Sequence, residues 1–437
     1  MLKFHTLRLA AFPVGLGLTS VMVSGTLNRV MIVELGLPAA LVGLLFAIPL
    51  LLAPARLALG YLSDGRPIGG KRREPYIIIG TGIAAVGMSG AALLITGPVS
   101  LGVIALGGGL LFAVYGLGFT LASNTFEALL ADRFSGASRP RAVTLAKVAM
   151  FAGIMFGALT LGRLLEPFDA DRLVWVATSV MVAYVMLATF AVLGQEPSRL
   201  DIEIVARKVT EAGFWRTVRD EIGRDPAARR FFVLVVISVL GTLAQDVLLE
   251  PYGALALGMS VSQTTRLSAV WGTGTLLAML SAGLWLIRWA GYWPVLRAGL
   301  RLNMAVFVGL ILAGALEQMA LFWGLVFALG LGTGLAMAGL LTAVIEYTTF
   351  ARAGLLMGVW GTAAELGQAG GMLMSGVVVD LMRALTGQDV LIAYGTVFAL
   401  ESALLGVALR LSFRVRVPAA QDQSAPGVHL DEVYSTQ

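Results

Sequence analysis

The sequence predicts an all-α membrane protein with twelve transmembrane helices in two six-helix halves and with both termini cytoplasmic. Three observations predict it: the composition, the spacing of the apolar segments and the placement of Lys and Arg. Of the 437 residues, 58% are hydrophobic and 13% are charged, and the mean hydropathy is +0.86. Soluble domains carry about 25% charged residues, and a polar surface always surrounds their core. Much of this apolar surface must therefore face lipid.

The first half is expected to contain six spans, because a helix needs about 20 apolar residues to cross the hydrocarbon core. The first apolar stretch is too long for a signal-peptide core and is interpreted as a span. A turn at Gly97-Pro98 separates the third span from the fourth. The expected spans are 10–33, 38–60, 76–97, 100–125, 143–165 and 172–194.

The second half follows the long polar segment from Gln195 to Arg230, which alternates charged and apolar residues. That pattern favours an amphipathic helix at the membrane surface. The expected spans beyond it are 230–249, 265–287, 294–315, 320–344, 354–378 and 390–410. The expected organisation is an N-terminal bundle (1–196), a cytoplasmic linker with an amphipathic segment (197–229), a C-terminal bundle (230–411) and a cytoplasmic tail of disorder-like composition (412–437).

Basic residues predict the orientation, since cytoplasmic loops of membrane proteins collect Lys and Arg. Most of the 31 Lys and Arg lie on the side of the two termini. The expected outer segments contain Arg29, Arg163, Arg172, Arg266 and Arg383. The same rule explains the net charge of +5, so we expect no nucleic-acid partner.

The loop between the second and third spans has spaced glycines, an acid and a basic cluster. Asp64 is able to accept hydrogen bonds from helix amides, and glycines allow a tight turn. The loop resembles the signature loop of the major facilitator superfamily, in which it acts as a conformational latch. The latch residues expected from this resemblance are Gly60, Asp64, Arg66, Arg72 and Arg73. The same superfamily has two six-helix halves with a cavity between them.

Two longer phrases resemble a narrower group, the PucC/LhaA family, the bacteriochlorophyll delivery branch of that superfamily. They are Ser63-Asp64 with Lys71-Arg72-Arg73-Glu74-Pro75-Tyr76-Ile77, and Gln245-Asp246-Val247-Leu248-Leu249-Glu250-Pro251-Tyr252-Gly253. The resemblance implies a multi-pass protein of the bacterial inner, intracytoplasmic photosynthetic membrane. It further implies an assembly factor for light-harvesting antenna complexes that handles bacteriochlorophyll transiently.

The partners implied by the resemblance are antenna polypeptides of the light-harvesting-1 or light-harvesting-2 type (LH1 or LH2) and reaction centre–antenna assembly intermediates. Pigment-synthesis enzymes are a further implied partner. The resemblance does not separate these antenna types. Two other functions stay open: a proton-coupled secondary transporter of a small or amphipathic solute, using acids such as Asp246, Glu127 or Glu365, and a pigment-free scaffold for antenna assembly.

Polar side chains within spans are candidate site residues, because polar groups inside a membrane usually face a cavity or a partner. Glu365 and Gln368 are three residues apart and share a helix face. Asp246 and Glu250 are four apart and would repel each other unless protonated or paired; Arg29 or Arg266 is the expected partner. The candidate binding residues are Glu365, Gln368, Asp246, Glu250, Gln245, Asn124 and Glu127.

Several kinds of chemistry find no support in the sequence. There is no cysteine, and His5 and His429 are the two histidines, so we expect no metal centre and no imidazole ligand within the bilayer. A pigment magnesium would have to use oxygen ligands, which magnesium prefers. No phosphate-binding loop or hydrolase motif is present, and we expect no enzymatic activity. The tryptophans, Trp271 among them, lie mostly near expected span ends, as interface anchors.

Overall fold

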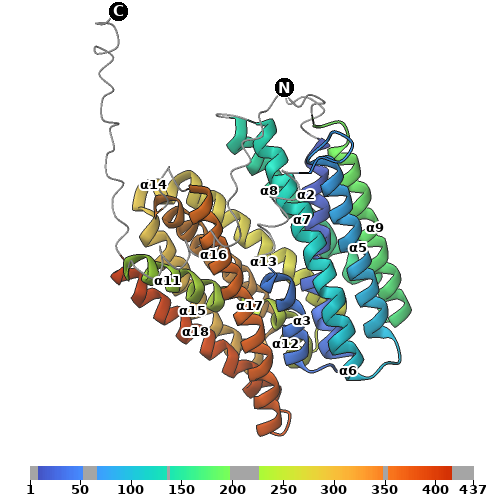
Figure 1. The fold of residues 1–437 in the computed structure, drawn as a ribbon. Coiled ribbons are helices and arrows are strands. Elements are labelled where there is room, and N and C mark those ends of the chain that lie inside the picture. Colours follow the sequence, from blue (N-terminus) through green and yellow to red (C-terminus); the bar gives the residue numbers. More distant parts are fainter. Residues whose placement is uncertain (1–7, 53–65, 135–137, 197–225, 348–352, 416–437) are drawn as a thin grey trace, which may run out of the picture.

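The fold is almost entirely helical (Figure 1), as the sequence predicts. The structure, a computed structural model, describes residues 8–52, 66–134, 138–196, 226–347 and 353–415. In that part of the chain, the pairing outside helices is one isolated bridge between Ile68 and Lys71. Gly60 and Asp64 of the expected latch, the linker 197–225 and most of the tail fall outside the described residues.

The first half begins with a helix that changes its winding. α2 (Ala11–Ser20) continues into π-helical stretches at Val21–Leu27 and Val30–Glu34. Such stretches are frequent at functional sites. The other helices of this half are α3 (Ala39–Leu51), α5 (Glu74–Thr96), α6 (Leu101–Val103), which continues through Ile104–Gly108 into α7 (Gly109–Arg133), α8 (Ser138–Leu164) and α9 (Ala170–Val192).

The second half is likewise a set of long helices, packed beside the first (Figure 1). Its helices are α11 (Pro226–Leu243), α12 (Leu249–Leu257), α13 (Val261–Ser281), which continues through Ala282–Leu286 into α14 (Ile287–Ala290), α15 (Tyr292–Ala315), α16 (Met319–Tyr347), α17 (Ala353–Leu385) and α18 (Val390–Arg414).

Ten of the described helical runs are long and apolar enough to cross a membrane. Each of the twelve expected spans overlaps a described helix or helical run, the second of them (38–60) only over Ala39–Leu51, because 53–60 lie outside the described residues. Two of the expected spans correspond to helices that are not among these ten. The helix α3 is apolar but has only 13 described residues. The helix α17 has 33 residues and carries Glu365, Asp380 and Arg383. The chain is thus a multi-pass membrane protein, and the number twelve stays a prediction.

The seventh expected span, 230–249, coincides with the helical run Ala228–Val247, but the run changes its winding at its end. α11 ends at Leu243, a single 3₁₀ turn covers Ala244–Val247, and α12 follows. A broken helix is tolerated at membrane depth where its backbone is buried in protein or lines a cavity. Asp246 lies in this break, and its surroundings are described below.

Glycines bring helices of the first half into backbone contact, as expected for a membrane bundle. A Cβ built on Gly153 of α8 would lie 2.2 Å from the carbonyl oxygen of Val14 in α2. A Cβ built on Gly17 of α2 would lie 2.1 Å from the carbonyl oxygen of Met150 in α8. The α2–α8 pair therefore depends on both positions lacking a side chain.

The two halves meet along α3 and α17, where an acid of one half caps a helix of the other. The carboxylate of Asp380 in α17 accepts the N–H groups of Ala39 and Ala40 at the start of α3, at 2.9 and 2.8 Å. The first N–H groups of a helix lack partners within the helix, and a negative charge is favourable there. Asp380 therefore ties the halves together at this end.

Replacing Asp380 with alanine is expected to lower the free energy of unfolding by about 1–2 kcal/mol, the usual effect of losing a helix cap. It should also loosen the contact between the halves. Asp389→Ala is the matched control, because Asp389 caps its own helix α18 through Ile392 N–H. Spin labels on Val99→Cys and Leu385→Cys report the distance between the halves. We expect this distance to lengthen or broaden with Asp380→Ala only; an unchanged distribution contradicts the role.

Candidate binding cavity

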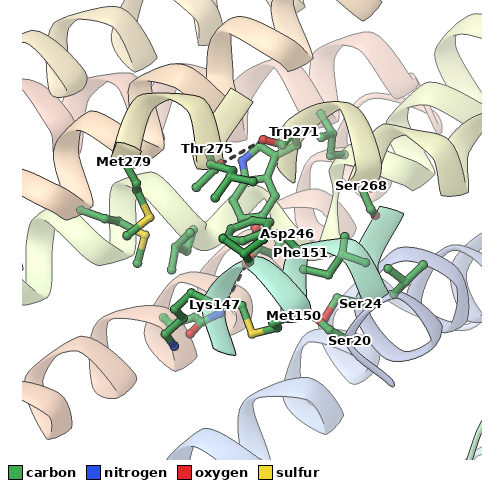
Figure 2. Close-up of a pocket in the computed structure, with 18 of the residues that line it drawn as sticks. Ser20, Ser24, Lys147, Met150, Phe151, Asp246, Ser268, Trp271, Thr275 and Met279 are labelled. Atoms are coloured by element: carbon green, nitrogen blue, oxygen red, sulfur yellow. Dashed lines mark hydrogen bonds between the residues drawn. The ribbon is translucent and has the colours of Figure 1, made fainter. Parts of the chain in front are cut away.

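A cavity of about 540 Å³ lies between the two halves (Figure 2). α2 and α8 line it from the first half; the break after α11, with α12, α13, α16 and α17, lines it from the second. Most lining side chains are apolar, among them Phe151, Met279 and Leu280. The volume falls within the range of about 300–1,000 Å³ that is typical of small-molecule sites.

Two acids and two carboxamides gather at one part of this cavity. Asp246, in the break after α11, accepts hydrogen bonds from the Nε2 groups of Gln245 (3.1 Å, to Oδ1) and Gln368 of α17 (3.3 Å, to Oδ2). Glu250 of α12 is buried, and its Oε1 accepts the hydroxyl of Ser268 of α13 at 3.1 Å. The break after α11 and the start of α12 therefore place both acids at the cavity.

Asn28 links this polar cluster to the first half. Its Nδ2 donates to the backbone oxygen of Asp246 at 3.1 Å and to Oε2 of Glu250 at 3.3 Å. Asn28 is completely buried and follows the π-helical stretch of the first span. Asp246 and Glu250 follow Asn28 in the sequence by 218 and 222 residues and belong to the other half, so Asn28 forms a polar bridge between the halves.

The expected cation for these acids is not Arg29. Arg29 Nη1 pairs with Glu34 Oε1 at 2.6 Å, five residues ahead in the same run, and that prediction is wrong. The Nε of Arg266 has no hydrogen-bond partner among the described residues. The hydrogen-bond partners described above for Asp246 and Glu250 are all neutral.

A third acid lies nearby. Glu401 of α18 is completely buried, and neither of its carboxylate oxygens has a hydrogen-bond partner among the described residues. It does not line the cavity. In the described part of the chain, no group of three Asp, Glu or His side chains has the arrangement of a metal site.

The structure divides the predicted site residues into two groups. Gln245, Asp246, Glu250 and Gln368 line the cavity together. The remaining three do not: Glu365 lies half-buried on α17, Asn124 is half-buried on α7 and Glu127 is exposed on α7. Of the predicted pair Glu365 and Gln368, only Gln368 is among the residues that line the cavity.

Other lining residues were not among the predicted site residues. Trp271 lies in the middle of α13, not at a span end, so its interpretation as an interface anchor is wrong. The cavity is also lined by Ser20 and Ser24 of the first span, by Lys147 of α8 and by Ser268 of α13 (Figure 2). Serine is common in membrane helices, so no sequence signal separates those that face a cavity from those that face a neighbouring helix.

The described part of the expected latch ties together helices of the first half. The carboxylate of Glu196 accepts the N–H groups of Arg72 and Arg73, both at 2.8 Å, ahead of α5. Glu74 Oε1 accepts the N–H of Glu196 in return, at 2.7 Å. Arg73 Nε contacts Asp132 of α7 at 3.0 Å. The backbone oxygen of Arg66 accepts a hydrogen bond from the hydroxyl of Tyr76 at 2.6 Å.

Glu196→Ala is expected to lower the free energy of unfolding by about 1–2 kcal/mol, because it leaves the N–H groups at the start of α5 without their acceptor. Glu166→Ala, which changes an exposed acid, should change it by less than about 0.5 kcal/mol. Thermal unfolding followed by circular dichroism measures both. Equal midpoints for the two variants would rule out the capping role of Glu196.

The sequence matches the family described as PUCC protein over residues 26–420. This chain belongs to the PUCC family. Protein PucC of Rhodobacter capsulatus is 33% identical over 428 residues, which cover 92% of this chain and 90% of that protein. The family match thus extends over both halves of the structure and over all cavity-lining residues except Ser20, Val21 and Ser24.

Two further relatives, also from Rhodobacter capsulatus, match over shorter stretches. An uncharacterized protein in the puhA-bchM intergenic region is 33% identical over 314 residues, 70% of this chain and 65% of that protein. A protein named Bacteriochlorophyll synthase 44.5 kDa chain is 34% identical over 282 residues, 63% of each chain. In these two comparisons the chain spans just under two thirds of the relative's length.

Solved structures place this PUCC protein in the major facilitator fold. The nucleoside transporter NupG has a TM-score of 0.74 at 13% identity, and the match covers 94% of this chain and 99% of that transporter. A D-xylose-proton symporter has a TM-score of 0.68 at 16% identity, with 92% and 96% covered. At these identities the likeness concerns the fold alone.

Proposed function

We propose that this protein is an assembly factor for bacterial light-harvesting antenna complexes, which binds antenna polypeptides and delivers bacteriochlorophyll. Membership of the PUCC family carries the proposal. The name of one relative, Bacteriochlorophyll synthase 44.5 kDa chain, refers to the same pigment. The proposed location is the bacterial inner, intracytoplasmic photosynthetic membrane. The partners would be antenna polypeptides, reaction centre–antenna assembly intermediates and pigment-synthesis enzymes.

The proposed topology has twelve spans, two six-helix halves and both termini in the cytoplasm. The distribution of Lys and Arg supports it, as does the correspondence between the expected spans and the described helices. In this orientation the latch contacts around Glu196 and the start of α8 lie on the cytoplasmic side. The cap formed by Asp380, which is half-buried, lies on the outer side.

The cavity has chemistry that suits a pigment held briefly. Its lining offers carboxylate, carboxamide and hydroxyl oxygens, from Asp246, Glu250, Gln368 and Ser268, and magnesium prefers oxygen ligands. Its walls are mostly apolar, as a polycyclic ring requires. We therefore place the pigment in this cavity and assign the polar cluster to its recognition.

Gentle purification from the native membrane tests the proposal. The absorption spectrum and the co-purifying polypeptides would be compared between the natural chain and Asp246→Asn. Antenna polypeptides together with near-infrared pigment support the proposed function, and loss of the pigment alone in the variant places it at the cavity. Antenna without stoichiometric pigment supports a pigment-free scaffold. Absence of both contradicts an assembly role.

A second candidate, a proton-coupled secondary transporter, is favoured by one observation. Asp246 and Glu250 face a cavity between two halves of a transporter fold, and their partners described here are neutral. Acids in such surroundings are able to exchange protons. Uptake of a solute into proteoliposomes, driven by a pH gradient and lost in Glu250→Gln, would support this function over assembly.

A further inference from the structure

Two residues that line the cavity, one on α8 and one on α13, are also partly exposed at the surface of the protein. Val148 of α8 and Leu280 of α13 both line the cavity, and they are 41% and 38% exposed. On α8, exposed Ala152 and Met155 follow Val148 at helical spacing; on α13, exposed Leu277 precedes Leu280 by three residues. Residues at these spacings share a helix face. Val148 and Leu280 therefore belong both to the cavity lining and to the apolar outer faces of their helices.

α8 and α13 touch at one end and separate toward the other. A Cβ built on Gly162 would lie 2.8 Å from the Cα of Ser262, so the backbones are in contact there. Further along α13, the atoms nearest to a Cβ built on Gly272 are side-chain atoms of Phe151 and Ile154, at 3.5 and 3.6 Å. Beyond this point the cavity lies between the two helices, which diverge in Figure 1.

The other junction between the halves is closed in its described part. A Cβ built on Gly43 of α3 would lie 2.3 Å from the oxygen of Met372 in α17. A Cβ on Gly376 of α17 would lie 2.4 Å from the oxygen of Ala39. These helices are in backbone contact at both positions, so the opening toward lipid lies on the α8–α13 side.

Polarity changes along the cavity. The exposed lining residues include the apolar Val148 and Leu280, with Thr144 and Lys147 on the same helix as Val148, whereas Asp246 is half-buried and Glu250 is buried. A volume of about 540 Å³ accommodates a polycyclic head group but not a long hydrocarbon tail beside it. A ligand matched to this gradient has a polar ring system inside and a tail that passes between α8 and α13 into the bilayer.

We propose that the cavity is loaded sideways from the bilayer, through the opening between α8 and α13, by an amphiphile whose tail stays in the lipid. The choice of a tetrapyrrole as head group rests on the proposed function. The route itself rests on the geometry of α8 and α13. The two parts are tested separately.

The first test concerns the opening and needs no pigment. Because the chain has no cysteine, Met279→Cys provides a single site for a nitroxide at the cavity wall. In lipid nanodiscs we expect collisions of the label with oxygen, which concentrates in lipid, to exceed collisions with a water-soluble nickel chelate. Adding Val148→Trp should remove most of the oxygen collisions, and adding Met155→Trp, on the same outer face of α8 but outside the lining, should not.

The second test concerns the ligand. Uptake of bacteriochlorophyll a from the nanodisc lipid is compared with uptake of its methyl ester analogue, which has the same ring without the long tail. Since access to a site controls association rates, Val148→Trp should slow uptake of the tailed pigment about tenfold. The methyl ester should be slowed much less, and Met155→Trp should slow neither.

The outcomes separate the two parts of the proposal. Collisions dominated by the nickel chelate, or an equal effect of Val148→Trp and Met155→Trp, overturn the sideways route whatever the pigment does. Oxygen access without uptake of either pigment by the natural chain overturns the pigment as ligand and leaves the bilayer route standing. Equal slowing of both pigments by Val148→Trp overturns the placement of the tail in the opening.

Discussion

Replacing Gly153 with leucine is expected to lower the free energy of unfolding by more than about 3 kcal/mol. Overpacking a core alone lowers it by about 1–3 kcal/mol, and here the new side chain would collide with the backbone of α2. A Cβ at this position would lie 2.2 Å from the carbonyl oxygen of Val14, so α2 and α8 must move apart. Moving them separates helices that contribute Ser20, Ser24 and Phe151 to the cavity. Both stability and ligand binding should therefore be lost.

The matched controls are glycines within helices that face open space. A Cβ on Gly82 of α5 or Gly324 of α16 meets no atom within 4 Å. Leucine at these positions should leave the unfolding midpoint unchanged or raise it, because glycine costs a helix about 1 kcal/mol relative to good helix formers. Circular dichroism in detergent compares the three variants. A midpoint for Gly153→Leu equal to that of Gly82→Leu contradicts the close contact of α2 and α8.

Asp246→Asn is expected to produce the largest functional loss, with an antenna level at least about tenfold lower, since a hydrogen bond to a charged group contributes about 1.5–3 kcal/mol. Both oxygens of Asp246 accept carboxamide hydrogens, from Gln245 and Gln368. Asparagine offers one acceptor and adds a donor that faces another donor. The variant would keep the side-chain volume, so the amount of protein in the membrane should stay unchanged.

Near-infrared absorbance of membranes from a strain with the variant as its sole copy measures the antenna, and immunoblotting measures the protein. Glu127→Gln is the control, because it neutralises an exposed acid of α7 outside the cavity. We expect it to retain the antenna level of the natural chain. If the two variants support equal antenna levels, the cavity acids have no part in assembly.

The 3₁₀ turn at Ala244–Val247 was not predicted from the sequence, although the span that contains it was. The apolar run continues through Leu243, Val247, Leu248 and Leu249, so the hydropathy of this segment predicts a single span. The carboxylate of Asp246 and the carboxamide of Gln368 meet across 122 residues of sequence, and a pattern within one segment contains no information on that contact. The polar residues of this segment were predicted as candidate site residues, but the change from α-helical to 3₁₀ winding around them was not.

Asp380 shows the same limit at a helix end. Within its own segment it is one acid near the end of a long helix, and no local pattern marks it. Its role follows from α3, because the N–H groups of Ala39 and Ala40 have no partner within their own helix and Asp380 lies against them. Close approach of α3 and α17 decides this contact.

The apolar segments were enough to predict a multi-pass helical membrane protein, because lipid excludes unpaired backbone groups and so acts on each apolar segment separately. The sequence also determined the family, and it identified the acids and amides of the second half as candidate site residues. Which of these residues share a cavity could be seen only from the packing of the helices. That grouping depends on how Asn28, α8 and α13 meet across the two halves, and such contacts arise from packing between distant segments.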